Sequence, residues 1–361
     1  MGALIALYLA RRDVPVLLLE KEPDLPVDLR ASTFHPPSLE MIEALGHGVI
    51  DEMLEKGLVV DRYQYRDRRT GEVANFDMGL IAGDTAYPYR LQREQYEFSR
   101  FVSERLSHLP AADVRFSHEV TGFVQTDDYV DVEVSSPTGT QTIRTPFLVS
   151  AEGAHSIIRK LAGIGYLGFT YDEKFLVVST PFPFEDVFDD LSWVNYVADP
   201  EEWCVILRTE KIWRVLFPTR PENQEDEALL LSDEFIQERL HHLWGKDGDY
   251  AIGHRTLYNV NQRVAETYYQ GRVLLAGDAC HINNPLGGMG MNGGLHDGNN
   301  LAAKLIRILR DGEDHLPLFE HYNRQRRDLA VRFVQEHTIA NKKLMEATDE
   351  QTQNARQQML M

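Results

Sequence analysis

The chain has 361 residues, of which 43% are hydrophobic and 26% charged, which is typical of a globular protein of about two domains. Its 37 basic and 56 acidic residues give a net charge of −19, which argues against binding to nucleic acid or to an anionic membrane. The two cysteines, Cys204 and Cys280, form no metal-ligand spacing, and no apolar run approaches the ~18 residues of a membrane-spanning helix. We expect a cytoplasmic protein without a bound metal.

The first twenty residues predict a helix followed by a buried strand. Apolar residues recur at helical spacing from Ala3 to Arg12, and the run from Val14 to Glu20 is continuous, as in a parallel strand covered on both faces. This is one half of a βαβ unit, and the strand that should precede it is missing. We therefore expect the chain to be truncated at its N-terminus.

Gly2 and Glu20 have the spacing of a dinucleotide-binding fingerprint. Glu20 ends the strand close to the ~20 residues after the glycine at which a ribose-binding acid is found. A glycine lets the helix pack closely on the strand, and a carboxylate can accept hydrogen bonds from both ribose hydroxyls. The pair fits a dinucleotide without a 2′-phosphate, and it fits a purely structural role equally well.

The middle of the chain is rich in strand patterns. Alternation around 130–134 predicts an antiparallel meander, which leads to an apolar strand at 147–151 and a helix at 156–161. Between about 164 and 260 the pattern is β-rich and aromatic, and two alternating stretches predict a hairpin at 203–207 and 213–217. We interpret the acidic stretch 222–227 as a solvated loop before a helix at 233–243.

The segment 272–292 carries the most specific motif. Residues 272–276 predict a buried strand that Gly277 and Asp278 end, and a loop rich in glycine then runs from Pro285 to Asn292. Helical spacing at 295–309, and again at 318–333, predicts two further helices.

This segment resembles the GD motif and GGxGMN loop of the FAD-dependent aromatic hydroxylases, the family of p-hydroxybenzoate, phenol and hydroxyphenylpropionate hydroxylases. The resemblance implies that Asp278 binds the ribityl chain of FAD. It also implies that the loop opens a helix whose N-terminus faces the flavin pyrimidine ring. Glycines let backbone N–H groups approach the ring, and the positive end of a helix stabilises negative charge on reduced flavin.

Three further stretches are similar to segments of the same family. Arg30 and Gln92 correspond to residues that contact FAD, and 150–159 resembles the family's DG motif, which is linked to both FAD and NAD(P)H. The motif departs from the pattern, because Glu152 stands for the usual Asp and His155 for the usual Arg. The nucleotide contact at His155 is therefore left open.

The residues assigned by resemblance form three groups. The FAD contacts are Gly2, Glu20, Arg30, Gln92, Asp278, Pro285, Gly288, Gly290, Met291 and Asn292. The backbone of Pro285 and Gly288 is assigned to the reacting ring, and no side chain is named as catalytic base. The NAD(P)H-linked residues are Glu152, Gly153 and Arg159, and the substrate pocket is assigned to Trp203, Val205, Trp213 and Val215.

The fold expected from the resemblance is α/β, with a Rossmann-like FAD-binding domain that lacks its first strand, an inserted β-sheet substrate domain and C-terminal helices. We place the FAD domain at 1–62, 88–163 and 262–315, and the substrate domain at 63–87 and 164–261. Residues 316–361 form the C-terminal helical segment.

The activity implied by the resemblance is hydroxylation of a phenolic or other electron-rich aromatic substrate. NADH or NADPH reduces FAD, O2 adds to form a flavin hydroperoxide, and one oxygen atom passes to the ring. Two alternatives stay open: a flavin oxidoreductase that does not hydroxylate, and a truncated non-catalytic remnant with impaired FAD binding. The expected partners are the small aromatic substrate, O2 and NAD(P)H, with no nucleic acid or membrane, and a homodimer is left open.

Overall fold

The computed structural model describes residues 1–27, 29, 31–46, 48–71, 73–199, 202–219 and 226–345. The chain forms two compact units. Unit 1 contains Met1–Glu55, Glu94–Phe169 and Gln262–His337, and unit 2 contains Lys56–Arg93, Thr170–Asn261 and Thr338–Met361. Residues 316–337, which we assigned to a separate C-terminal segment, therefore cluster with unit 1.

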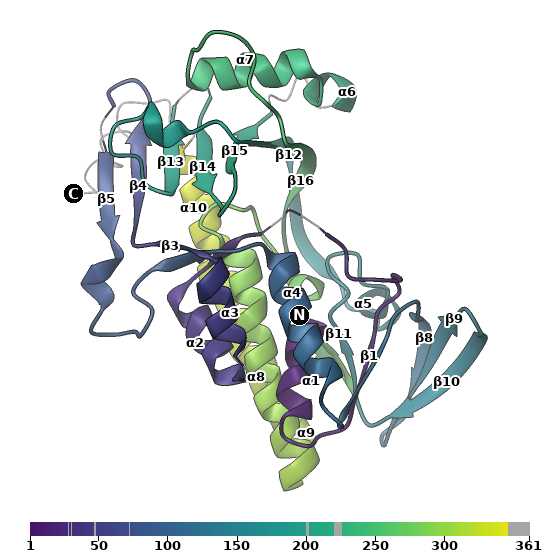
Figure 1. The fold of residues 1–361 in the computed structure, drawn as a ribbon. Coiled ribbons are helices and arrows are strands. Elements are labelled where there is room, and N and C mark those ends of the chain that lie inside the picture. The colour runs from purple at the N-terminus through teal and green to yellow at the C-terminus, as the bar shows by residue number, and fades with distance from the viewer. Residues whose placement is uncertain are drawn as a thin grey trace. The chain divides into compact units, whose positions relative to one another are not determined.

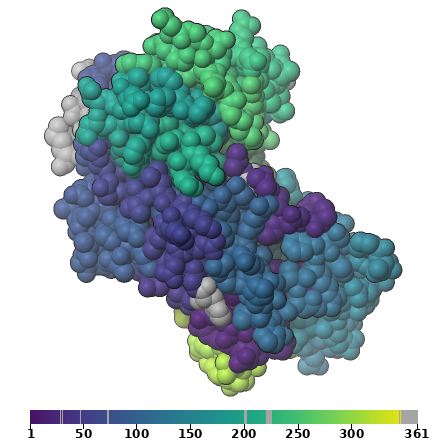
Figure 2. All heavy atoms as spheres, viewed as in Figure 1, coloured from purple at the N-terminus to yellow at the C-terminus, as the bar shows by residue number. Residues whose placement is uncertain are grey.

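Unit 1 holds most of the helices (Figure 1). They are α1 (Gly2–Ala10), α2 (Pro36–Leu45), α3 (Val49–Lys56), α4 (Gln95–Ser107), α5 (Ile157–Leu161), α8 (Met289–Asp311) and α9 (His315–Leu329), followed by the π-helical η5 (Ala330–Gln335). Leu4 to Ala10 are buried in α1, and Figure 2 shows part of this first segment between α4 and the α8–α9 region. An apolar helix of this kind needs cover on all sides, and its neighbours provide it.

The strands of unit 1 form small separate sheets. In the parallel pair β1 (Val16–Leu19) and β7 (Ala112–Arg115), Val16 lies opposite Ala112. A second sheet has the order β11 (Leu148–Ser150), β18 (Val273–Leu275) and β17 (Tyr269–Gln270), with β11 and β18 parallel. Among the described residues no strand joins these two sheets. Gly2 lies close to both, because a Cβ added there would be 3.1 Å from Leu18 and 3.6 Å from Ala151.

The antiparallel meander of unit 1 follows its sequence pattern. It consists of β8 (Glu119–Gln125), β9 (Val130–Ser136) and β10 (Gly139–Thr145). The valines Val130, Val132 and Val134 are buried as a small core cluster, and the acidic residues between them point away from it. Two short strands, β2 (Thr33–Phe34) and β19 (His281–Ile282), complete the unit.

Unit 2 is built on one large sheet. Its strands follow the order β16 (His254–Ala265), β12 (Tyr166–Thr180), β15 (Trp213–Pro218), β14 (Cys204–Arg208), β13 (Val194–Ala198), β4 (Arg62–Asp67) and β5 (Val73–Asp77). The first residues of β12 and the last of β16 belong to unit 1. Smaller elements are β3 (Leu58–Val60), β6 (Arg90–Gln92), η1 (Met78–Ile81), η2 (Phe184–Asp186), α6 (Glu227–Leu230), α7 (Asp233–Leu243) and α10 (Glu336–Met345). Residues 220–225 lie outside the described residues, so most of the predicted acidic loop is not described.

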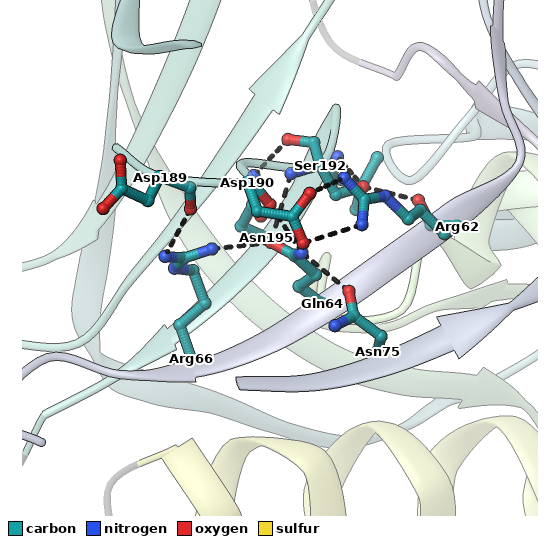
Figure 3. Close-up of polar contacts among 9 residues, drawn as sticks. Arg62, Gln64, Arg66, Asn75, Asp189, Asp190, Ser192 and Asn195 are labelled. Carbon is teal, nitrogen blue, oxygen red and sulfur yellow. Dashed lines mark hydrogen bonds and ion pairs between the residues drawn. The ribbon is translucent and has the colours of Figure 1, made fainter. Parts of the chain in front are cut away.

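A buried polar network fastens β4 to the loop before β13 (Figure 3). Gln64 is fully buried, and its amide donates to the Asp190 carbonyl at 2.8 Å and to Asn75 Oδ1 at 2.7 Å. Gln64 Oε1 accepts hydrogen bonds from Arg66 at 2.8 Å and from the backbone N–H of Ser192 at 3.1 Å. Both the amide nitrogen and the amide oxygen of Gln64 are thus hydrogen-bonded, as buried polar groups generally are.

One predicted boundary is wrong. We expected a helix at 295–309, but α8 begins at Met289 and ends at Asp311. Glycines lower helix propensity, which hid the first turn. Gly288, the N-cap residue, has a left-handed φ of 65°, which favours glycine.

Candidate active site

The turn that follows β18 presents Asp278 outward. β18 is completely buried, and η4 (Gly277–Ala279) follows it directly. Gly277 has a φ of 64°, which favours glycine, and both Gly277 and Ala279 are buried while Asp278 is exposed. A single carboxylate therefore stands out from a buried strand end.

Glu20 lies in the same region as Asp278. It directly follows β1, where its N–H donates to the Arg115 carbonyl and its Oε1 accepts from the N–H of Glu22 at 3.0 Å. Burial lowers the pKa of the Met1 amino group, and Asp278 and Glu20 both oppose that shift, so both carboxylates lie near the first residue. The structure thus brings together Gly2, Glu20 and Asp278, which are far apart in the sequence.

The predicted glycine loop forms the start of α8. Gly288 donates its N–H to the Pro285 carbonyl at 3.0 Å, and as the N-cap residue it has no side chain with which to cap the helix. The first N–H groups of a helix have no partner within the helix. Gly290 and Met291 lie in this first turn, so their backbone belongs to the positive end of the helix.

Asn292 joins α8 to β2. Its amide donates to the carbonyls of Thr33 at 2.8 Å and Gly288 at 2.6 Å, and its Oδ1 accepts from the N–H of His35 at 3.0 Å. The side chain is buried and occupied by protein contacts. Its expected FAD contact therefore stays a prediction that concerns the backbone.

The structure gives no support to the assignment of two other predicted FAD residues, Arg30 and Gln92. Arg30 lies outside the described residues. Gln92 is the last residue of β6 in unit 2, fully buried, and pairs with Leu58 of β3. Both assignments stay predictions.

The predicted NAD(P)H segment is largely engaged within the protein. Glu152 Oε2 accepts hydrogen bonds from the hydroxyls of Ser150 and Ser156, at 2.8 and 2.6 Å, and from the N–H of Ile158 at 3.1 Å. Arg159 is buried and donates to the carbonyls of Ala279 at 3.2 Å and Ala154 at 2.8 Å. Gly153 has a φ of 82° with no neighbour near its missing Cβ. A direct nucleotide contact by Glu152 or Arg159 stays a prediction. The hydrogen bonds that both side chains make within the protein argue against it.

A buried ion network lies beneath the Asp278 turn. Asp297 of α8 is completely buried and accepts from His281 at 2.8 Å, from Arg326 at 2.7 Å and from the N–H of Gly277 at 3.3 Å. Arg326 also donates to the Gly293 carbonyl at 3.2 Å. Burial by itself would raise the pKa of Asp297, but His281 and Arg326 outweigh it and lower the pKa. One carboxylate thus fixes the turn, β19, α8 and α9 together.

Comparison with known proteins agrees with this arrangement. A family model described as an FAD binding domain matches residues 1–337. The chain is 31% identical over 357 residues to para-nitrophenol 4-monooxygenase from Pseudomonas sp. (strain WBC-3), covering 96% of this chain and 85% of that protein. The chain belongs to the FAD-dependent aromatic hydroxylases. It is also 29% identical to 6-hydroxy-3-succinoylpyridine 3-monooxygenase HspB from Pseudomonas putida (strain DSM 28022 / S16), over 90% of this chain and 82% of that protein.

The fold of this hydroxylase agrees with a solved structure. The crystal structure of p-nitrophenol 4-monooxygenase PnpA from Pseudomonas putida DLL-E4 superposes with a TM-score of 0.91 at 30% sequence identity. The superposition covers 99% of this chain and 90% of that one. The α/β fold class and the family assignment are therefore confirmed.

The described part of the hydroxylase holds neither a metal-binding cluster nor a membrane-spanning helix. No group of histidine, cysteine, aspartate and glutamate side chains could hold a metal ion there. None of the helices described is both long and apolar enough to cross a membrane.

The four predicted substrate residues of the hydroxylase lie on opposite faces of the unit 2 sheet. In the β14–β15 pair Ile206 lies opposite Val215, while Val205 lies opposite Leu216, so Val205 and Val215 face opposite ways. Trp213 and Val215 belong to the hydrophobic core that α7 covers. The role of Trp213 and Val215 in the substrate pocket stays a prediction. Their burial in this core argues against it.

The other face of this sheet is aromatic. Val205 lies opposite Tyr196, which stacks on Tyr65 with ring centroids 4.9 Å apart. Trp203 packs edge-on against Phe175 at 5.5 Å. Trp203 and Val205 are also buried, so their assignment to the substrate pocket stays a prediction as well.

Sequence reasoning missed the residues that hold the Asp278 turn from behind. Arg159 had been assigned to NAD(P)H, Asp297 and Tyr166 were not singled out, and Tyr166 donates its hydroxyl to the Asp278 carbonyl at 2.8 Å. A signal was present for Asp297, because it stands three residues after Gly294 and four before Leu301 on the buried face of α8. A carboxylate on a buried helix face needs a charged partner. Nothing in the sequence pointed to Tyr166.

Proposed function

We propose that this hydroxylase inserts one oxygen atom of O2 into a phenolic or other electron-rich aromatic substrate, with FAD as cofactor and NAD(P)H as electron donor. The observation that carries the proposal is the exposed Asp278 between two buried residues, in the same unit as the glycine-rich N-terminus of α8. A hydroxyl-bearing, partly anionic cofactor such as FAD needs both a carboxylate acceptor and backbone donors.

The described residues fit this cofactor. Asp278 and Glu20 supply two carboxylates that can accept from ribityl and ribose hydroxyls. Gly2 begins α1 and Gly290 lies in the first turn of α8, so their backbone N–H groups belong to the positive ends of two helices. FAD, when bound, supplies the two-electron transfer from NAD(P)H and the activation of O2.

The overall reaction balances without any metal. One aromatic C–H bond becomes C–OH, O2 and NAD(P)H with one proton are consumed, and water and NAD(P)+ are released. The chain contributes binding and orientation, because the positive end of α8 favours negative charge on the reduced ring system. Para-nitrophenol is the first compound to test, because the relative with 31% identity is named for it. Its C4 carries a nitro group in place of hydrogen, so oxygen insertion there releases nitrite and leaves benzoquinone, with the same consumption of O2 and NAD(P)H.

The proposed cofactor contact can be tested with Asp278→Ala. Loss of a charge-assisted hydrogen bond should weaken FAD binding by about 10- to 100-fold. The dissociation constant is measured by titrating apoprotein with FAD and following flavin fluorescence.

The matched control is Asp131→Ala. Asp131 is a carboxylate of unit 1 that pairs with Arg144 on the meander, and its removal should leave FAD affinity unchanged. If Asp278→Ala binds FAD as tightly as Asp131→Ala does, the cofactor site is wrongly assigned.

A further inference from the structure

Three backbone positions of the Asp278 turn are held by side chains from outside the turn. The N–H of Gly277 is bonded to Asp297, the Asp278 carbonyl to Tyr166, and the Ala279 carbonyl to Arg159. These three contacts all involve the backbone of the turn, and none of them uses the Asp278 carboxylate.

Tyr166 and Arg159 also hold each other. The Arg159 guanidinium lies over the Tyr166 ring, 3.9 Å from its centroid, which is a cation–π contact. Arg159 is fixed in turn by α5, since its other terminal nitrogen donates to the Ala154 carbonyl and Ser156 caps that helix. The tyrosine hydroxyl is thus directed at Asp278 from a rigid base.

The hydroxyl remains a donor at ordinary pH. Burial raises the pKa of Tyr166 above its usual value, and the nearby Asp278 raises it further. Tyr166 is half-buried at the start of β12, whereas the Asp278 side chain is exposed. The hydrogen bond therefore joins the half-buried Tyr166 to the main chain of the exposed Asp278.

We infer that Tyr166 is a positioning residue for the cofactor: by holding the Asp278 carbonyl, it orients the Asp278 carboxylate toward the ribityl chain. This inference rests on the proposed FAD contact of Asp278. Without the hydroxyl, the peptide after Asp278 can rotate, and the carboxylate then has several orientations of which only one is productive. Positioning of this kind contributes to binding because the ordering is already done in the free protein.

The test is a double-mutant cycle with Tyr166→Phe and Asp278→Ala. Tyr166→Phe alone should weaken FAD binding about three- to tenfold, the size of one net hydrogen bond. In the Asp278→Ala background, where the backbone bond persists but the carboxylate is gone, the same change should cost less than about twofold. The bound flavin of Tyr166→Phe should also have a shifted visible absorption band, because the isoalloxazine ring is held less uniformly.

The control is Tyr322→Phe. Tyr322 donates to the Leu275 carbonyl at the same distance, 2.8 Å, but in the buried strand before the turn. It should lower the melting temperature and leave FAD affinity and the flavin spectrum unchanged.

Each outcome has one meaning. If Asp278→Ala itself does not weaken FAD, the proposed cofactor contact fails and this inference fails with it. If Asp278→Ala weakens FAD but Tyr166→Phe does so equally in both backgrounds, or not at all, the cofactor site stands and the positioning role is wrong. An equal loss of affinity in Tyr322→Phe would likewise show that only general loosening of the strand matters.

Discussion

At the scale of single residues, the site depends on how buried charges are paired. Asp297, His281 and Arg326 are all buried, and the network holds only while the carboxylate is ionised. A buried charge that loses its partner is strongly destabilising, whereas an exposed pair contributes little. Asp297 therefore supports the cofactor site through stability rather than through contact.

Asp297→Asn keeps the size of the side chain and removes its charge. It should lower the free energy of unfolding by about 3–5 kcal/mol, because Arg326 is left buried without a counter-charge. Urea denaturation measures the loss, and Asp131→Asn, on the exposed pair with Arg144, serves as a control that should change little.

The free energy of unfolding lost in Asp297→Asn should depend on pH. The folded-state pKa of Asp297 lies below its ordinary value of 3.8, so the stabilisation is complete above that pH and is lost as the pH falls below it. The difference in free energy of unfolding between the unchanged protein and Asp297→Asn should therefore become smaller as the pH falls. A difference that stays constant down to the acid limit of folding would contradict the charged network.

At the scale of elements, close approach between strands requires glycine at one position above all. Gly168 in β12 has a φ of 134°, and a Cβ there would lie 2.0 Å from the carbonyl oxygen of Gln262 in β16. This conformation is open almost only to glycine, and the neighbouring atom is backbone. The packing of these two strands within unit 1 thus excludes any side chain.

Gly168→Ala should destabilise the protein by about 3 kcal/mol or more, since backbone strain and a backbone clash add together. Gly163→Ala is the control, because Gly163 also has a positive φ, 68°, but nothing lies within 4 Å of its missing Cβ. Backbone strain alone should destabilise Gly163→Ala by about 1–2 kcal/mol. Equal melting temperatures for the two variants would show that the strands can separate without cost.

At the scale of the whole molecule, patterns local in sequence were predictable and contacts distant in sequence were not. Alternation predicted the β8–β9–β10 meander and the β14–β15 pair, and the helix expected at 233–243 is α7 at the same bounds. The strand before Asp278 was predicted from its apolar run, whereas the glycine-rich first turns of α8 were interpreted as a loop. These elements carry most of the proposed cofactor site.

The contacts that support this site join residues far apart in the chain. Tyr166 reaches Asp278, and Arg326 reaches Asp297, through packing that no periodicity encodes. Arg159 was assigned to a nucleotide from its motif, yet its nitrogens bond the Ala279 and Ala154 carbonyls. An alternating pattern also does not tell which face of a strand is covered, so Trp213 was assigned to a pocket although α7 covers it.

The central claim is that the protein transfers oxygen from O2 to an aromatic ring. The most direct measurement is mass spectrometry of the product formed under 18O2, with FAD, NAD(P)H and para-nitrophenol, followed by a panel of other phenols. We predict one labelled oxygen atom per product molecule, with NAD(P)H consumed in equal amount. Consumption of NAD(P)H and O2 that yields only hydrogen peroxide and unlabelled substrate, across the whole panel, would contradict the account and favour a flavin oxidoreductase that does not hydroxylate.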